Sequence, residues 1–378
     1  MPPSQPRATA DAPEQILVRG VNWLGDAVMT TPALQRLRER FPQAHITLLT
    51  PAKLSALWLH HPSIDDLLPV TPDEGLWAVA RRLRARAFQL AVILPNSTRS
   101  ALECWLGRIP RRVGYSRRWR DWLLSEAVPP RPGHLRMRKR SPGEIRRLIR
   151  TPLPLPPSQP PPAAHQIHDY LCLTATLGAN PAPRAPLVRV TPAEIERAQL
   201  TLLPEPSGAG LPLLGLNPGA EYGPAKRWPA ANFVTVAGEV SRRLGPCRWL
   251  LFGAPHDLPL CEEIARAIGG SAVNLAGRTS LRDLMGLLKQ CQVLLTNDTG
   301  PMHLAAALGT PVVVPFGSTS PVLTGPGSPG DPRHRLLTAD TPCAPCFLRA
   351  CPIDFRCMTG ITPERMAAAV MDVIGGNR

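Results

Sequence analysis

The chain has 378 residues, of which 44% are hydrophobic, so it can build two or three domains with buried cores. Its 43 basic and 28 acidic residues give a formal net charge of +15, and only four of the basic residues are lysines, which leaves 39 arginines. This composition excludes a collagen-like chain, a disordered chain and a small disulfide scaffold. No apolar run approaches the roughly 18 residues of a membrane-spanning helix, so we do not expect an integral membrane protein.

The N-terminal residues 1–14 are polar and rich in proline, and they lack the apolar core of a signal peptide. We therefore expect a disordered tail there and a cytoplasmic protein. In that compartment the nine cysteines are expected to be mostly reduced.

Residues 15 to about 128 alternate short apolar runs with segments of helical period. The pattern predicts strands at 16–21, 45–50 and 89–95 and helices at 26–40, 53–61, 75–88 and 98–106. Such alternation is typical of parallel βαβ units, and we place a first Rossmann-like domain at residues 15–180.

An arginine-rich and proline-rich insertion, residues 131–164, interrupts this pattern. In its centre, Ser141 as a helix cap and Pro142 at the first helical position predict a short helix over 141–150. The proline-rich flanks cannot carry regular hydrogen-bonded structure, so we expect a loop that becomes ordered on binding or a mobile flap. A helix at 165–178 follows, and residues 181–192 are expected to form a linker.

The second half of the chain restarts the alternation. It predicts strands at 212–219, 248–255, 272–277, 293–298 and 311–317 and helices at 228–244, 258–268, 281–291 and 302–309. Ser280 and Asp283 have the spacing of a capping box. We expect a second Rossmann-like domain at 193–360 and a C-terminal helix at 361–378. The predicted fold class is therefore α/β, with two doubly wound parallel sheets.

Ligands of such sheets bind where the strands end, and Asp26 lies just after the first strand. Gly25 permits a turn there, and an ionised carboxylate can accept a proton from a hydroxyl nucleophile. The alternative is structural, because aspartate is a favoured helix cap and negative charge stabilises the first helical turn.

A second candidate site runs from Thr296 to His303, from the end of a strand into a helix. The backbone N–H groups of Thr299 and Gly300, with the helix dipole behind them, can bind an anion. His303 lies about one turn into the helix and can direct a ring N–H at the same anion. The alternative is a helix capped by Asp298 or Thr299, with a histidine on the surface.

The loop 217–229 follows the first strand of the second half and carries Lys226. Small residues such as Gly219 and Ala220 let the backbone approach a phosphate closely, and a flexible ammonium suits a diphosphate. This loop contains neither GxxxxGK[ST] nor GxGxxG, which argues against a P-loop NTPase and a dehydrogenase. Because this loop and the motif 296–303 are both predicted to bind phosphate, we expect a diphosphate ligand.

Four stretches, 22–34, 217–229, 274–321 and 351–364, together resemble the lipopolysaccharide heptosyltransferases of glycosyltransferase family 9. The resemblance follows nearly the whole chain in order, except for about 131–164. It implies the GT-B arrangement, in which two Rossmann-like domains face a cleft. It also implies inverting transfer of heptose from ADP-L-glycero-D-manno-heptose, with no cofactor and no catalytic metal.

By position, the resemblance makes Asp26 the general base and Lys226 the cation that holds the donor diphosphate. It assigns donor binding to Gly219, Ala220, Lys226, Asp257, Asp298, Thr299, Gly300 and His303. Asn22 and Trp23 stand where first-heptose enzymes have serines, so we expect acceptor contacts there and transfer of the second heptose.

The basic surface suits an anionic glycolipid acceptor at the inner membrane, where we expect the protein to associate peripherally. A solvated arginine-rich surface and nucleic-acid binding are the alternatives. No helix-turn-helix, RNP or zinc-finger pattern is present, so we expect no nucleic acid. Another nucleotide-sugar transferase of the same fold, or a basic surface-binding protein without enzyme activity, remains an alternative function. The sequence leaves the oligomeric state open.

Four cysteines, Cys343, Cys346, Cys351 and Cys357, fall within fifteen residues. Four thiols can hold structural zinc or an iron–sulfur cluster, although the later spacings differ from those of a zinc finger. Reduced free thiols or a reversible disulfide are the alternatives. A metal here would stabilise a proline-rich loop and would take no part in glycosyl transfer.

Overall fold

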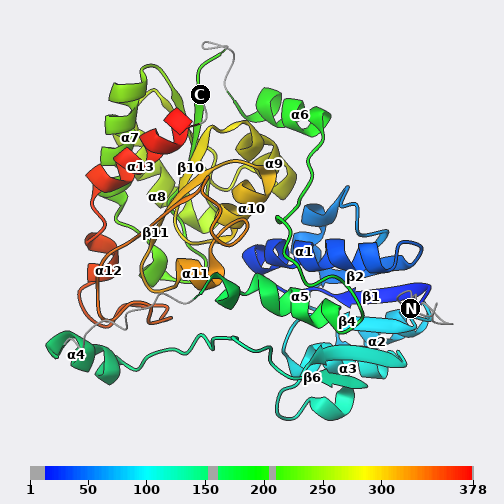
Figure 1. Ribbon diagram of the computed structural model, residues 1–378. Helices are drawn as coiled ribbons and strands as arrows, with labels where there is room; N and C mark the ends of the chain where they lie inside the picture. Colours follow the sequence, from blue (N-terminus) through cyan, green and yellow to red (C-terminus); the bar gives the residue numbers. More distant parts are fainter. Residues whose placement is uncertain (1–12, 152–160, 204–209, 377–378) are drawn as a thin grey trace, which may run out of the picture. The chain divides into compact units, whose positions relative to one another are not determined.

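The computed structural model describes residues 13–151, 161–203 and 210–376 (Figure 1). Most of the predicted N-terminal tail, residues 1–12, lies outside this part, as does 152–160 of the predicted insertion. The chain divides into two compact units. The first contains the residues up to Asn22, Thr30–Pro132 and Ile167–Arg184, and the second contains Trp23–Met29, Gly133–Gln166 and Ala185–Arg378.

The first unit is built on a parallel six-stranded sheet in the order β3-β2-β1-β4-β5-β6. Its strands are β1 (Gln15–Arg19), β2 (His45–Pro51), β3 (Asp66–Val70), β4 (Leu90–Ile93), β5 (Arg111–Tyr115) and β6 (Glu126–Val128). Its helices are α1 (Leu24–Arg40, from Thr30 onward), α2 (Leu76–Arg84), α3 (Thr98–Leu106) and α5 (Ile167–Ala175). In Figure 1, α1 covers one face of the sheet and α2 and α3 cover the other. Helices lie on both faces because the strand order runs in one direction from β1 to β3 and in the other from β4 to β6.

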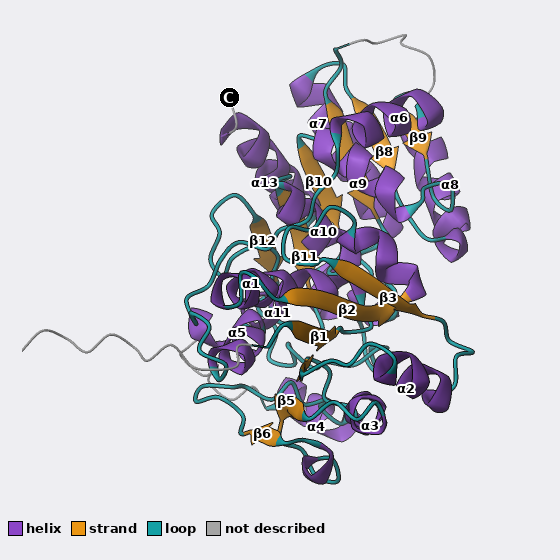
Figure 2. Cartoon of the chain, turned by 90° about the vertical axis from the view of Figure 1, so that its right-hand side faces the viewer, coloured by secondary structure: helices purple, strands orange, loops and turns teal. Residues whose placement is uncertain are grey.

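The second unit is built on another parallel six-stranded sheet, in the order β12-β11-β10-β7-β8-β9. Its strands are β7 (Leu213–Asn217), β8 (Arg248–Leu251), β9 (Ala272–Asn274), β10 (Val293–Thr296), β11 (Val312–Phe316) and β12 (Arg335–Thr338). Its helices are α4 (Pro142–Arg150), α6 (Pro192–Leu202), α7 (Ala230–Leu244), α8 (Leu258–Ile268), α9 (Leu281–Gln290), α10 (Gly300–Leu308), α11 (Pro321–Thr324), α12 (Arg356–Thr359) and α13 (Pro363–Gly376). Figure 2 shows helices α7, α8, α9 and α13 beside the strands of this sheet.

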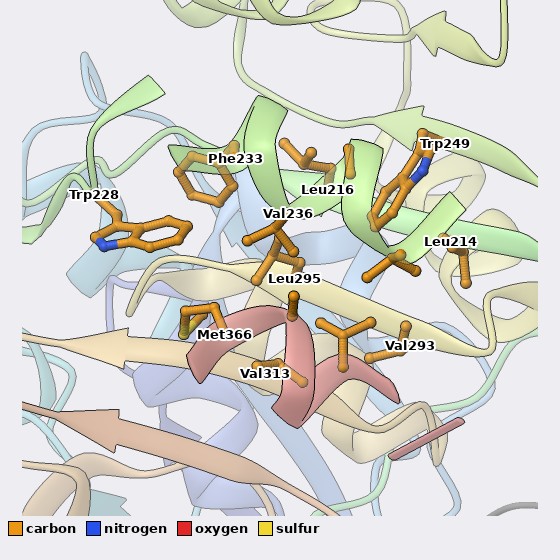
Figure 3. Packing of buried hydrophobic residues seen from close by; sticks show 14 of the residues in the cluster. Leu214, Leu216, Trp228, Phe233, Val236, Trp249, Val293, Leu295, Val313 and Met366 are labelled. Atoms are coloured by element: carbon orange, nitrogen blue, oxygen red, sulfur yellow. The ribbon is translucent and has the colours of Figure 1, made fainter. Parts of the chain in front are cut away.

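The core of the second unit lies between its sheet and helices α7 and α13 (Figure 3). On α7, the residues Phe233, Val236, Ala237 and Val240 repeat with helical spacing and are all fully buried. They pack on strand residues such as Leu216, as Figure 3 shows. This packing holds the loops at the ends of β7 and β10 in place.

The predicted fold class is confirmed, with two parallel sheets covered by helices. Four strands escaped sequence-based prediction, β3, β5, β6 and β12, because they are short and carry polar residues or proline. The predicted helix at 53–61 is a 3-10 helix, Ala52–Trp58, whose ends lack side-chain caps. Helix α6 begins where we expected the linker to end, because Thr191 and Glu194 form a capping box. The predicted capping box of Ser280 and Asp283 is present.

Candidate active site

The candidate site lies where the strand order of the second sheet reverses. Strand β7 pairs with β8 on one side and with β10 on the other, so the connections that leave β7 and β10 diverge. Open parallel sheets bind ligands at such a switch point, beside the carboxyl ends of the strands. Two loops begin there, 218–229 and 297–299. They are the two loops that the sequence predicts to bind phosphate.

Asn297 fastens these two loops to each other from a fully buried position. Its Nδ2 donates to the backbone oxygen of Pro218 at 2.7 Å, and its Oδ1 accepts from the backbone N–H of Trp228 at 3.0 Å. One side chain therefore holds both ends of the loop 218–229, which we call the glycine-rich loop. At the strand ends, Asn217 Nδ2 donates to Thr296 Oγ1 at 3.2 Å.

Lys226 of the glycine-rich loop forms an ion pair with Asp298 of the loop 297–299, with Nζ 2.6 Å from Oδ2. Both side chains are largely buried, with 14% and 5% of their surfaces exposed. Thr319 also donates a hydrogen bond to Asp298 Oδ2, and the Lys226 ammonium lies 5.0 Å from the ring centroid of Tyr222. The lysine is thus held by a carboxylate and by an aromatic face, which fixes a cation beside the glycine-rich loop.

Helix α10 begins beside this pair with an N-terminus that no side chain caps. Thr299 occupies the N-cap position, but its side chain makes no capping hydrogen bond. A side-chain capping role for Thr299 is therefore excluded. In the first turn Pro301 has no N–H and the Met302 N–H donates to the Thr299 oxygen, so the backbone N–H groups of Thr299 and Gly300, with the helix dipole, are the candidates for binding an anion. His303 is buried, which excludes the surface histidine of the alternative interpretation.

Burial decides the charge of His303. Loss of solvent around the imidazole lowers the pKa of His303 to about 4, despite the opposing attraction of Asp298. The ring is therefore neutral at pH 7 and can donate one N–H without adding positive charge.

Asp26 belongs to the first turn of α1, which groups with the second unit. Loss of solvent raises the pKa of Asp26 to about 6, although Lys226 and a hydrogen bond from Gln166 act in the opposite direction. Gln166 Nε2 lies 3.5 Å from Asp26 Oδ1. A carboxylate with a pKa just below neutrality is ionised at pH 7 and remains a good proton acceptor.

Gly25 lies within helix α1, so our prediction of a turn at this residue is wrong. The close approach of His303 explains the glycine instead. A Cβ atom on Gly25 would lie 2.6 Å from His303 Cδ2, which is closer than real Cβ contacts allow. The absence of a side chain therefore lets the start of α1 contact the histidine.

Asp257 follows β8 and contacts the glycine-rich loop. Its Oδ1 accepts from Arg227 at 3.1 Å and its Oδ2 from the backbone N–H of Ala254 at 3.2 Å. A Cβ on Gly219 would lie 2.3 Å from Asp257 Oδ2, so only glycine fits at that position. Ala220 beside it is buried.

Asn22 and Trp23 are exposed just before helix α1, and 48% of the surface of Trp23 is accessible. The two residues fall in different compact units. Their predicted contact with an acceptor stays a prediction.

The four cysteines of the predicted cluster line one small cavity, together with Ile145 of α4. Burial raises the pKa of Cys343 and raises that of Cys357 to about 12, so both thiols are protonated at neutral pH. Within the described ranges, no group of three or more cysteine, histidine or acidic side chains is arranged to hold a metal ion. The predicted zinc or iron–sulfur site therefore gains no support from the geometry.

Three residues that contribute to the site were missed by sequence reasoning as functional residues, namely Asn297, Thr319 and Gln166. Asn297 stood inside the motif 296–303, and its place directly after a buried strand was a usable signal. Thr319 and Gln166 carry no such local signal, because their partners Asp298 and Asp26 are 21 and 140 residues away.

The two parallel six-stranded sheets, covered by helices, match the GT-B fold of heptosyltransferase structures. Residues 156–355 match the family model described as glycosyltransferase family 9 (heptosyltransferase). The chain belongs to this family and is a glycosyltransferase.

Named relatives agree with this assignment. The chain is 30% identical over 338 residues to lipopolysaccharide heptosyltransferase 2 of Salmonella typhimurium, which covers 86% of this chain and 88% of the relative. It is 31% identical over 335 residues to lipooligosaccharide heptosyltransferase 2 of Haemophilus influenzae, with 86% and 89% covered.

Solved structures show the same fold over almost the whole chain. The structure of E. coli ADP-heptose LPS heptosyltransferase II matches with a TM-score of 0.73 and 26% identity, covering 96% of this chain and 99% of that one. A family 9 glycosyltransferase from Veillonella parvula matches with a TM-score of 0.75 at 23% identity, covering 96% and 97%. None of the helices in the described parts of the chain has the length and apolar character needed to cross a bilayer.

Proposed function

We propose that this enzyme transfers heptose from ADP-L-glycero-D-manno-heptose to the inner core of lipopolysaccharide, where it adds the second heptose. The observation that carries the proposal is the Lys226–Asp298 pair beside the uncapped start of α10, a site suited to a diphosphate. The relatives named heptosyltransferase 2 support the choice of sugar and acceptor.

The donor diphosphate would lie between the glycine-rich loop and the N-terminus of α10. Gly219 and Ala220 let the backbone come close, and Lys226 supplies a positive charge beside the phosphates. Thr299 and Gly300 supply backbone N–H groups, and the neutral His303 supplies one further donor. Asp257, after β8, is proposed to lie at the nucleoside end.

The reaction is a single displacement that inverts the anomeric carbon. The acceptor hydroxyl oxygen forms a bond to this carbon while the bond from carbon to the diphosphate oxygen breaks. Asp26 takes the proton of the hydroxyl, and ADP leaves with the bonding electron pair. Lys226 and the α10 amides stabilise the charge that develops on the diphosphate. No step requires a metal or another cofactor.

The acceptor is an anionic glycolipid, and we place the enzyme in the cytoplasm, peripherally associated with the inner membrane. A formal net charge of +15 favours both an anionic acceptor and an anionic bilayer. Asn22, Trp23 and the arginine-rich insertion are proposed to contact the acceptor.

The deciding experiment measures ADP release by the purified protein in the presence of EDTA. The protein is given ADP-heptose with a truncated core acceptor that carries one heptose, with an acceptor that carries none, or with no acceptor. We expect release only with the one-heptose acceptor, and Asp26→Asn should abolish it while ADP binding is retained. Equal release without acceptor, or full activity of Asp26→Asn, would overturn the proposal.

A different donor would be revealed by ligand-induced thermal stabilisation. We expect ADP to raise the melting temperature more than UDP or GDP at equal concentration, because binding to the native state stabilises it by mass action. Greater stabilisation by UDP would indicate another nucleotide-sugar transferase of the same fold.

A further inference from the structure

The first unit carries an exposed patch of tryptophan and arginine that the proposed reaction does not use. It is formed by the end of α3, the residues that follow it and the segment between β5 and β6. We call it the Trp–Arg surface, and it consists of Trp105, Arg108, Arg117, Arg118, Trp119 and Trp122.

Three indole rings on this surface face solvent although they are among the most apolar side chains. The exposed fractions are 42% for Trp105, 80% for Trp119 and 65% for Trp122. Trp105 and Trp122 contact each other edge to face, with ring centroids 5.8 Å apart. A pair of exposed indoles in contact, with the exposed Trp119 three residues before Trp122 in the chain, indicates an interaction site.

Hydrogen bonds anchor the segment between β5 and β6, which carries Trp119 and Trp122. Arg120 is fully buried, and its Nη1 donates to the backbone oxygen of Pro95 at 2.9 Å. Asp121 accepts hydrogen bonds from Ser116 Oγ at 2.6 Å and from the backbone N–H of Arg117 at 2.8 Å. These hydrogen bonds anchor the backbone of the segment that carries Trp119 and Trp122.

Two residues of the surface adopt a strained backbone conformation. Trp119 has a φ of 68° and Arg108 has a φ of 57°, in the left-handed region that side chains disfavour. Backbone strain of this kind concentrates at functional positions. At Trp119 it accompanies the most exposed indole of the group.

The charge of the Trp–Arg surface is positive. Arg108, Arg117 and Arg118 are exposed, and none of them has an ion-pair partner among the described residues. The acidic residue within the same segment, Asp121, is engaged by Ser116 and by the Arg117 backbone. The segment 117–122 thus carries two exposed arginines and one carboxylate together with its two indoles, and Arg108 adds a third exposed arginine just after α3.

We propose that the Trp–Arg surface docks the enzyme on an anionic phospholipid bilayer. Indole rings partition to the level of the lipid headgroups, because each has an apolar body and one N–H donor. Arginines beside them are attracted to the negative surface of the membrane. This inference deepens the proposed function and rests on it for the presence of a lipid-anchored acceptor.

The test is binding of the full chain to vesicles, without donor or acceptor. Vesicles of phosphatidylcholine alone are compared with vesicles of phosphatidylcholine and phosphatidylglycerol by co-sedimentation. We expect binding to the anionic vesicles only, with a blue shift of tryptophan fluorescence. Trp119→Ser with Trp122→Ser, and separately Arg117→Glu with Arg118→Glu, should each weaken binding by about tenfold or more.

Matched controls separate a local effect from a general change of charge or fold. Arg266→Glu with Arg365→Glu makes the same change in net charge on exposed residues of α8 and α13 and should leave binding within about twofold. Arg117→Lys with Arg118→Lys should retain binding, since the charge is kept. All variants should release ADP from the soluble truncated acceptor at the wild-type rate, which shows that they fold.

The outcomes distinguish this inference from the proposed function. Normal ADP release with no vesicle binding overturns the docking surface alone, whereas vesicle binding without ADP release overturns the proposed function alone. Equal loss of binding in the Arg266/Arg365 control would overturn the assignment to this surface. If the tryptophan variants instead change the oligomeric state in light scattering, or abolish binding to single-stranded RNA, the partner is a second copy or a nucleic acid and the lipid proposal is wrong.

Discussion

Lys226 Nζ lies 2.6 Å from Asp298 Oδ2, so the cation that is proposed to bind the donor already has an anionic partner within the protein. The carboxylate is almost completely buried and also accepts a hydrogen bond from Thr319. The pair keeps the lysine oriented at the switch point of the sheet and offsets its charge. The ion pair is therefore already formed before a diphosphate binds, and the lysine side chain needs little reorganisation to contact the diphosphate.

Replacement of Lys226 tests the role of this pair in catalysis. Lys226→Ala should lower kcat/KM for transfer by about 100-fold or more, because the charge that we propose to face the leaving diphosphate is lost. Lys226→Arg should retain more activity, since the positive charge remains. Steady-state ADP release at varied donor concentration measures both effects. Equal activity of the alanine variant and the wild type would show that the lysine is structural.

The same replacement should also destabilise the protein. Lys226→Ala leaves Asp298 buried without its counter-ion, which costs about 3–5 kcal/mol. Thermal or urea unfolding measures the loss. The double variant Lys226→Ala with Asp298→Asn should recover part of it, because no unpaired charge then remains. A double variant no more stable than the single one would contradict this account.

The pH dependence of transfer should report the titration of Asp26. Since the pKa of Asp26 is raised to about 6, the carboxylate of this proposed base is ionised at pH 7 and protonated at pH 5. We expect kcat/KM to fall about tenfold for each pH unit below about 6. An acid limb near pH 4, the ordinary range of aspartate, would show that the carboxylate is not held in this environment.

Asp26→Asn should make the protein inactive and more stable. A raised folded-state pKa means that the folded state binds the proton more tightly, so unfolding free energy is lost as pH rises from about 4 to about 6. Asparagine at this position does not titrate, so the free energy of unfolding no longer falls over this pH range. The variant should therefore gain on the order of 2 kcal/mol at pH 7 and nothing below pH 4. Urea unfolding at the two pH values measures the difference, and a destabilised variant at pH 7 would contradict it.

His303 should act as a neutral hydrogen-bond donor. The lowered pKa, about 4, predicts that His303→Gln retains more activity than His303→Ala, and that neither creates a new transition between pH 6 and pH 8. The lowered pKa also means that wild-type stability falls as pH drops from about 6.5 to 4, and His303→Gln should remove part of that fall. Unfolding of both proteins across this pH range checks the sign.

Asn297 should matter for the fold and the donor site together. Asn297→Ala removes the side chain that holds both ends of the glycine-rich loop and leaves the Trp228 N–H and the Pro218 oxygen without their partner. We expect a loss of about 2–4 kcal/mol and a higher KM for the donor. Asn232→Ala, on the first turn of α7, is the matched control and should change neither.

The cysteine cluster can be tested by alkylation of the native protein. Cys357 is buried and its pKa is raised to about 12, so it should react far more slowly than the partly exposed Cys351. EDTA should leave the pattern unchanged if the thiols are free. Faster labelling of all four cysteines after chelation, with release of zinc or iron, would establish the metal site that the spacing permits.

The local sequence determined the elements with strong patterns and the motifs between them. The capped helices at Ser141 and Ser280, and the end of α10 at Gly309 with its φ of 88°, follow from residue type and spacing alone. So do the loop that carries Lys226 and the strand-to-helix motif of 296–303. Caps, periodicity and turn residues act over a few positions, so these features can be predicted directly from the local sequence.

Only the tertiary structure decided what these motifs contact. The pairing of β7 with β10 brings Asn297 to Trp228, 69 residues away, and Lys226 to Asp298. Strands β5 and β6 have no pattern of their own and form because neighbouring strands complete their hydrogen bonds. The neutral state of His303 and the raised pKa of Asp26 depend on how much solvent distant residues exclude. Desolvation and ion pairing depend on distance in space, which the sequence sets only through the completed fold.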